Sequence, residues 1–194
     1  MRASTVVASL TLALSSLPAG SEALKQASAF AAIEPAELRA AAIFKEVAKV
    51  FAHARCANCH PASDRPMQTD GSRPHLPLVA RGADGFGAAG LKCQSCHMEA
   101  NSATGVPGAP HWHLAPQSMS LLGKTAGELC RQIKDPAQNG DRSVPVIIMH
   151  VAFDPLIKWS WEPGGTRDPA PGTHQDFVAL MNAWAQAGAA CPAD

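Results

Sequence analysis

The chain has 194 residues, of which 15 are Gly and 16 are Pro, so loops must occupy much of it. Lys and Arg together number 16, as do Asp and Glu, and the formal net charge is zero. A hydrophobic content of 46% argues against a disordered chain. The charge balance leaves no basic excess for nucleic acid or an anionic lipid surface. We therefore expect a folded domain that binds no nucleic acid.

Residues 1–23 have the pattern of an export signal. Arg2 supplies a positive charge, an uncharged and mostly apolar run follows from Thr5 to Leu17, and small residues precede a cleavage point after Ala23. The apolar run is shorter than the ~20 residues that a membrane span needs. We expect a mature domain of residues 24–194, exported to the periplasm and without a stable membrane span; an uncleaved anchor is the alternative.

The first predicted helix follows Pro35. Apolar residues recur at helical spacing at Ala40, Phe44, Val47 and Phe51. This face is expected to pack into a core while the helix runs into the first of two cysteine motifs.

Two segments have the pattern C-x-x-C-H. This is the attachment pattern of haem c, in which two thiols bond the porphyrin vinyl groups and the adjacent imidazole binds the iron. We expect two covalently bound haem c groups, with cysteines attaching each porphyrin and a histidine as the first axial ligand of each iron. The residues are Cys56, Cys59 and His60 in the first motif, and Cys93, Cys96 and His97 in the second.

A four-cysteine zinc site and a dithiol redox pair are the alternatives for two C-x-x-C pairs. Neither calls for a His after each pair. The 33 residues between Cys59 and Cys93 also exceed the usual spacing of zinc knuckles. Because the motifs start only 37 residues apart, two separate cytochrome domains do not fit, and both haems are expected in one domain.

Each iron has a sixth position, for which six other histidines compete. His75 lies in a stiff, Pro-flanked segment with enough chain to reach the far face of a haem, and we favour it. His111 and His113 point to the same side of an extended chain, and of these we favour His113. His150 lies in an apolar stretch where an unpaired imidazole would be costly, so it is a third candidate, as iron ligand or propionate partner.

The remaining candidates are weaker. His53 is expected on a helix surface, and His174 in solvent at the start of a helix. Met119 is the best sulfur ligand if one iron has His/Met rather than bis-His ligation.

Two further helices have start signals. Thr125 and Glu128 form the pattern of a capping box, and that helix should end before Pro136. Thr173 begins the last helix, which Gly188 can close. No strand pattern is evident, so the expected fold is all-α: a loop-rich single domain organised by its haems.

Two cysteines remain outside the haem motifs. In an exported chain, Cys130 and Cys191 are expected to form a disulfide, and its loop of about 60 residues would contribute on the order of 4 kcal/mol. Two buried free thiols are the alternative. The segment 154–172 reads as a long loop, and its Trp159 and Trp161 are candidates to cover a haem edge or to fill the core.

The chain resembles a group of small bacterial periplasmic dihaem c-type cytochromes, some of which are labelled as a subunit of isoquinoline 1-oxidoreductase. That label implies an electron-accepting role toward a molybdenum hydroxylase, and the resemblance favours His75 and His113 over His53 and His111. The segments that carry it are Arg73-Pro74-His75, Trp112-His113-Leu114-Ala115-Pro116, Glu128-Leu129-Cys130, Trp161-Glu162-Pro163-Gly164-Gly165 and Pro169-Ala170-Pro171-Gly172-Thr173.

The leading hypothesis is a periplasmic dihaem electron-transfer protein whose redox partner is a dehydrogenase or another cytochrome. The alternatives are a haem enzyme that acts on a small oxidant such as peroxide through one open iron, and a haem-based sensor. Ligation of both irons on both faces would favour electron transfer over the other two.

Overall fold

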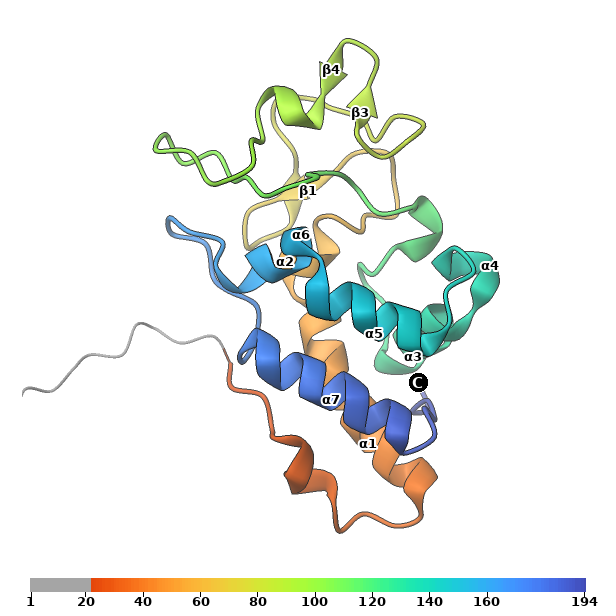
Figure 1. Ribbon diagram of the computed structural model, residues 1–194. Coiled ribbons are helices and arrows are strands. Elements are labelled where there is room, and N and C mark those ends of the chain that lie inside the picture. The colour runs from red at the N-terminus through yellow and green to blue at the C-terminus, as the bar shows by residue number, and fades with distance from the viewer. Residues whose placement is uncertain (1–21) are drawn as a thin grey trace, which may run out of the picture.

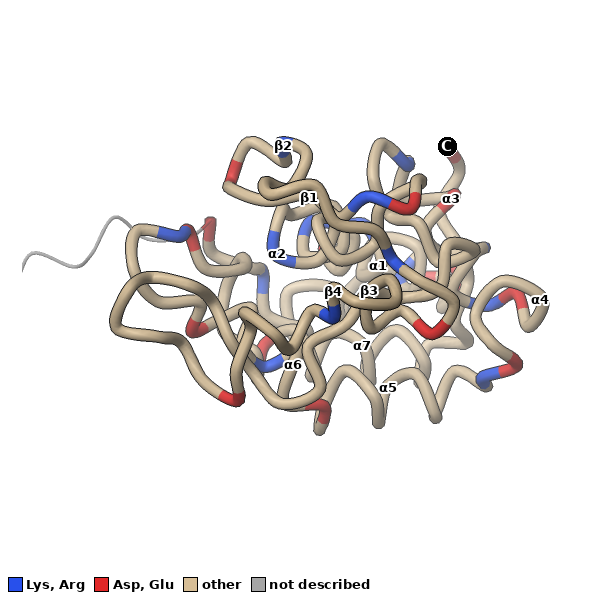
Figure 2. The backbone as a smooth tube through the Cα atoms, turned by 90° about the horizontal axis from the view of Figure 1, so that it is seen from above, with Lys and Arg blue, Asp and Glu red and all other residues tan. Residues whose placement is uncertain are grey.

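The computed structural model describes residues 22–194, so the expected export signal lies outside the described residues except for Glu22 and Ala23. The described chain is mostly helical, with prominent loops, and forms one small domain (Figure 1). Within this part of the chain, no helix is long and apolar enough to cross a membrane. Charged residues of both signs are dispersed over the backbone, as the formal net charge of zero suggests (Figure 2).

Four helices form one half of the molecule, the lower half in Figure 1. They are α1 (Ala36–Ala52), α3 (Ala126–Lys134), α5 (Val144–Phe153) and α7 (His174–Gln186). Short helical segments adjoin these helices: α2 (Ala54–Ala57), α4 (Pro136–Asn139) and α6 (Pro155–Lys158), with the 3-10 turns η1 (Ala27–Phe30) and η4 (Trp159–Trp161). We call this part the helical half. The 3-10 turns η2 (Cys93–Ser95) and η3 (Gln117–Met119) lie outside this part, among residues 58–125.

The core of the helical half lies chiefly between α1 and α7. Phe44 and Trp184 are fully buried with ring centroids 5.0 Å apart, and Phe51 meets Phe177 edge to face at 5.4 Å. Burial of each such side chain contributes roughly 1.5–3 kcal/mol. The apolar face predicted for the first helix is therefore confirmed, because Ala40, Phe44, Val47 and Phe51 are all buried.

The predicted capping box at Thr125 is present, and the last helix begins with a second one at Thr173. Thr125 Oγ1 accepts a hydrogen bond from the Glu128 amide at 3.1 Å, and Glu128 accepts one from the Thr125 amide at 2.8 Å. At the start of α7, Thr173 Oγ1 accepts from the Asp176 amide at 3.0 Å, and the Asp176 carboxylate accepts from the Thr173 amide at 3.3 Å. These bonds satisfy amides that the first helical turn leaves unpaired.

Residues 58–125 form the loop half, which contains no α-helix. Two short antiparallel pairs lie within it: β1 (Met67–Gln68) with β2 (Arg73–Pro74), and β3 (Gly87–Ala88) with β4 (Leu91–Lys92). The expectation of no strands was wrong in this respect. Ladders of two residues are too short to produce the alternation by which strands are recognised.

The loop half has little apolar interior of its own. The buried cluster that fills the helical half contains no residue between Phe51 and Leu121. Large apolar side chains in the loop half are instead exposed: Leu76 by 69%, Leu78 by 70% and Met98 by 61%. Because ordering a chain of this length costs conformational entropy, some other interaction must hold these loops.

Two local expectations need correction, and one helix was not expected. The helix expected to run into the first cysteine motif is interrupted at His53, and α2 begins after it. The apolar stretch that contains His150 is helix α5, which is apolar on most sides and so lacks a helical pattern. The segment 154–172 contains α6 and η4, so only its second part is an extended loop.

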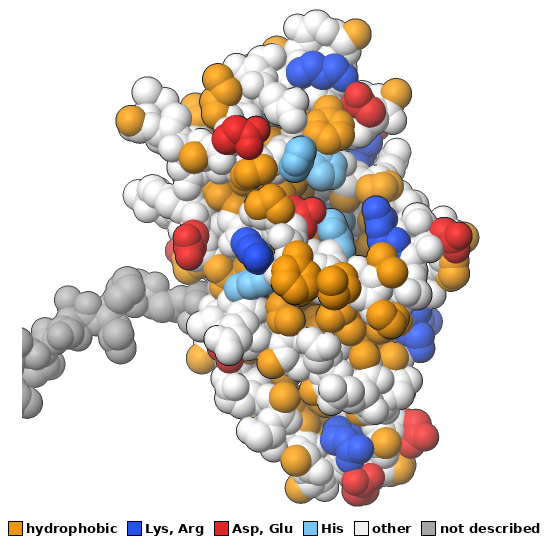
Figure 3. All heavy atoms as spheres, viewed as in Figure 1, with side chains coloured by type: hydrophobic (Ala, Val, Ile, Leu, Met, Phe, Trp, Pro, Cys, Tyr) orange, Lys and Arg blue, Asp and Glu red, His pale blue; other side chains and the backbone are white. Residues whose placement is uncertain are grey.

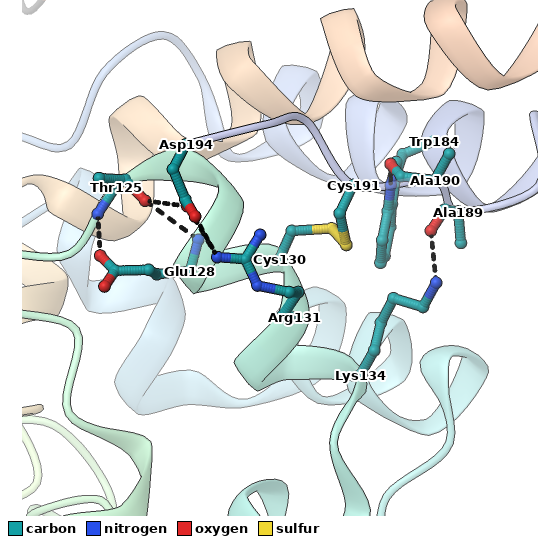
Figure 4. The surroundings of a disulfide bond; sticks show 10 residues. All are labelled: Thr125, Glu128, Cys130, Arg131, Lys134, Trp184, Ala189, Ala190, Cys191 and Asp194. Carbon is teal, nitrogen blue, oxygen red and sulfur yellow. Dashed lines mark hydrogen bonds and ion pairs between the residues drawn. A yellow bond between two sulfur atoms is a disulfide. The ribbon is translucent and has the colours of Figure 1, made fainter.

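The predicted disulfide is present. Cys130 on α3 is bonded to Cys191 near the C-terminus, with Cα atoms 5.5 Å apart (Figure 4). Two further interactions fasten the same tail to α3: Arg131 pairs with Asp194 at 2.7 Å, and Lys134 donates to the Ala189 carbonyl at 2.8 Å. The C-terminal tail is therefore part of the helical half.

Candidate functional site

The two cysteine motifs share one backbone hydrogen bond. The Cys59 amide donates to the Cys56 carbonyl at 3.2 Å, and the Cys96 amide donates to the Cys93 carbonyl at 3.1 Å. The first motif begins in α2, inside the helical half. The second follows β4 and occupies η2 in the loop half, where Cys96 is exposed.

An open cavity of about 1180 Å³ lies against the first motif, a volume that includes the space at its mouth. Its wall is mostly apolar, as in pockets that bind organic cofactors. Cys56, Cys59 and His60 line it, and so do Trp159 and Trp161. Apolar side chains from the surrounding elements complete the wall: Phe51, Leu121, Ile147, Val151, Ile157 and Phe177.

His60 is prepared to bind a metal through Nε2. Its Nδ1 lies 2.7 Å from the carbonyl oxygen of Met119, which can only accept, so Nδ1 carries the proton. Burial lowers the pKa of His60 to about 4, although the hydrogen bond to Met119 opposes the shift. The ring is therefore neutral at pH 7, with the Nε2 lone pair free, as in metal-binding histidines whose other nitrogen donates to a carbonyl.

His97 repeats this arrangement in the second motif. Its Nδ1 lies 2.7 Å from the carbonyl oxygen of Pro107, and burial lowers its pKa. Gly108 allows the chain to pass close by, because a Cβ there would lie 2.3 Å from the Ala100 carbonyl oxygen. Both C-x-x-C-H histidines thus present a free Nε2.

His75 lies beside His97 with ring centroids 6.0 Å apart and an interplanar angle of 62°. With metal–imidazole bonds of about 2 Å on each side, two axial imidazoles place their centroids roughly 6 Å apart. The Nδ1 of His75 donates to the Pro77 carbonyl at 3.0 Å, and Arg65 holds the backbone by donating to the His75 carbonyl at 2.7 Å. The separation of the two rings therefore matches that of two imidazoles bound to one metal ion.

His113 and His150 both line the cavity at the first motif, facing it from different elements. His113 lies in the loop half, donates from Nδ1 to the His111 carbonyl at 2.5 Å and stacks on Phe86 at 4.8 Å. His150 lies on α5 with its Nδ1 3.4 Å from an Asp154 carboxylate oxygen. Its side chain is 45% exposed, so the expected enclosure among apolar residues was wrong.

Histidine side chains accordingly lie among hydrophobic ones on the face shown in Figure 3.

The remaining histidines have other roles or surroundings. The Nδ1 of His53 accepts from the Arg55 amide at 3.3 Å and so caps α2, and His111 is exposed. The Nε2 of His174 donates to the Val151 carbonyl at 2.8 Å, so the expectation that His174 is solvated was wrong.

Met119 lies close to the first motif. Its carbonyl oxygen accepts a hydrogen bond from His60 Nδ1, and its sulfur lies 3.9 Å from the Gln132 side-chain nitrogen. Met119 also lines the cavity, as His113 and His150 do. The cavity wall therefore contains a thioether as well as these two imidazoles.

The first cysteine pair does not have the electrostatics of a redox dithiol. Burial raises the pKa of Cys56 to about 12 and that of Cys59 to about 11. Reactive C-x-x-C pairs depend on a lowered pKa. Within residues 22–194, no three His, Cys, Asp or Glu side chains form a cluster that could hold a bare metal ion; a haem iron needs only two axial ligands from the protein.

Sequence reasoning missed two features of the site. Trp112 stacks on His97, and Asp154 faces His150, although neither carries a motif of its own. The position of Asp154 four residues after His150 was a usable clue once a helix is assumed there.

Comparisons with protein-family models, curated proteins and solved structures find no match for this chain.

Proposed function

We propose that this protein is a periplasmic dihaem c-type cytochrome that transfers single electrons between redox partners. The observation that carries the proposal is that the two C-x-x-C-H histidines have the same hydrogen-bonding arrangement. Each donates from Nδ1 to a backbone carbonyl at 2.7 Å and leaves Nε2 free beside two cysteines. A haem bound there supplies reversible one-electron chemistry at its iron.

Each residue has a definite task in this proposal. Cys56 and Cys59 attach the first haem, and Cys93 and Cys96 the second. His97 and His75 would together hold the second iron. His60 is the proximal ligand of the first, for which His113 and His150 are the two candidate distal ligands.

The protein would support electron transfer by holding all of these groups still. Carbonyls of Met119 and Pro107 orient the His60 and His97 rings, and apolar side chains of the first cavity would surround a macrocycle bound there. Fixed axial ligands and an apolar surround limit rearrangement when the charge on the iron changes. The partner is a redox protein, either a dehydrogenase or another cytochrome.

A haem enzyme that acts on a small oxidant such as peroxide is the second candidate, favoured by the partial exposure of His150 at the first cavity. In that case His150 or His113 would act as an acid or base beside an open iron rather than bind it.

The test combines mass, absorption and carbon monoxide. The mature protein should carry two covalent haems in an intact-mass measurement after denaturation, and its reduced visible spectrum should remain low-spin when CO is added. A mass without haem would overturn the proposal. Two covalent haems, one of which is high-spin and binds CO, would support the enzyme.

A further inference from the structure

We propose that Trp112 is a positioning residue for the second redox centre: its indole fixes the ring plane of His97 and thereby the angle between the His97 and His75 planes. This inference rests on the proposed haem function. It concerns a residue that touches an axial ligand and is neither a ligand nor an attachment site.

The contact between the two rings is close and nearly parallel. The centroids of His97 and Trp112 are 4.5 Å apart, and the ring planes differ by 3°. An imidazole held only by the Nδ1 bond to Pro107, at 2.7 Å, could still tilt about that bond. The indole face opposes this tilt, because the imidazole would either move into the indole or lose the stacking contact with it.

The position of Trp112 is itself fixed by a contact with Trp159. Trp159 meets it edge to face, with centroids 4.9 Å apart and an interplanar angle of 81°. The indole nitrogen of Trp159 donates to Asn101 Oδ1 at 2.9 Å, and the same oxygen accepts from the Gly108 amide at 3.0 Å. Asn101 therefore ties the support of Trp112 to the residue next to Pro107, so both constraints on His97 share one anchor.

The angle that Trp112 fixes is a physical property of the centre. His75 and His97 are inclined by 62°, far from parallel. In a low-spin ferric haem, the angle between two axial imidazole planes sets the splitting of the iron d orbitals. A large angle gives a highly anisotropic electron paramagnetic resonance signal, whereas near-parallel planes give a more rhombic one.

The experiment measures that signal in Trp112→Leu of the full protein with both haems attached. The signal of the second haem is first identified as the low-spin signal that His75→Ala removes. In Trp112→Leu the same signal should shift or broaden and the reduction potential of that haem should change, while intact mass still shows two haems. Trp112→Phe keeps an aromatic face and should restore the wild-type signal.

Phe86→Leu is the matched control, because Phe86 stacks on His113 in the same way, at 4.8 Å and 23°. It should leave the signal of the second haem unchanged. If Trp112→Leu does not load two haems, Trp159→Leu takes its place, since it releases Trp112 without removing the stack partner of His97. The inference is wrong if the g values and potential of the second haem stay as in the wild type, or if Phe86→Leu shifts them equally. A wild-type protein without covalent haem would instead refute the proposed function.

Discussion

His75 and His97 approach each other from separate loops, with ring centroids 6.0 Å apart, and each ring has its Nδ1 engaged by a backbone carbonyl. If they bind one iron, His75→Ala should open the second haem. About half of the iron in that variant should become high-spin and bind CO, while intact mass still shows two haems. His111→Ala is the control, because His111 is exposed and should leave both irons low-spin.

The distal ligand of the first iron can be identified with three variants. His113 and His150 line the same cavity as His60, but one iron takes only one of them. We expect His113→Ala to open the first haem to CO and His150→Ala to leave it closed; the reverse pattern would assign the role to His150. If only the double variant binds CO, either imidazole can serve. A double variant that stays closed would exclude both.

The loop half should depend on its haem. Because the buried apolar cluster contains no residue between Phe51 and Leu121, attachment of the second haem should order this segment. A variant with Cys93 and Cys96 both replaced by Ala should lose protection from amide hydrogen exchange across the loop half. Protection of α1 and α7 should persist. Equal protection of the loop half with and without that haem would contradict the prediction.

Removal of the disulfide should destabilise the protein without opening either haem. Replacement of Cys130 and Cys191 by Ala should lower the free energy of unfolding by roughly 2–4 kcal/mol, measured in urea. In the wild type, alkylation under denaturing, non-reducing conditions should leave both cysteines unlabelled. The visible spectrum of the variant should match that of the wild type, because the disulfide joins the C-terminal tail to α3 and does not lie at the cavity.

The capping box of α7 predicts how the stability of the protein changes in acid. Thr173→Ala should cost about 1 kcal/mol of unfolding free energy at pH 7. The pKa of Asp176 is lowered by hydrogen bonds from Gln26 and Thr173, so its carboxylate stabilises the fold above its ordinary pKa of ~3.9 and loses that effect as pH falls below it. The stability gap between wild type and Asp176→Asn should therefore shrink in acid, as denaturant midpoints would show.

The sequence predicted those elements whose signals are local. The capping boxes at Thr125 and Thr173 need only a few neighbouring residues, and both helices begin where they indicated. The pairing of Cys130 with Cys191 followed from there being two cysteines outside the motifs. Helix α5 was missed because an almost uniformly apolar helix has no polar face to reveal its period.

Within the candidate site, residue type was easier to predict than arrangement. The motifs named six residues at once, and both motifs share one backbone hydrogen bond. Which imidazole faces which motif depends on how the loops fold back, and the separation of His75 from His97 is a tertiary quantity. The stack of Trp112 on His97 depends on the Asn101 anchor, which no spacing in the chain reveals.

The bond between Cys130 and Cys191 closes a covalent ring that contains α4, α5, α6 and α7. One wall of the first cavity belongs to this ring, whereas Cys56, Cys59 and His60 belong to the linear chain before it. A single peptide-bond cut anywhere between the two half-cystines would therefore open the ring without detaching any fragment. The wall that carries His150 would stay tethered to α3, through the peptide chain when the cut follows His150 and through the disulfide when the cut precedes it.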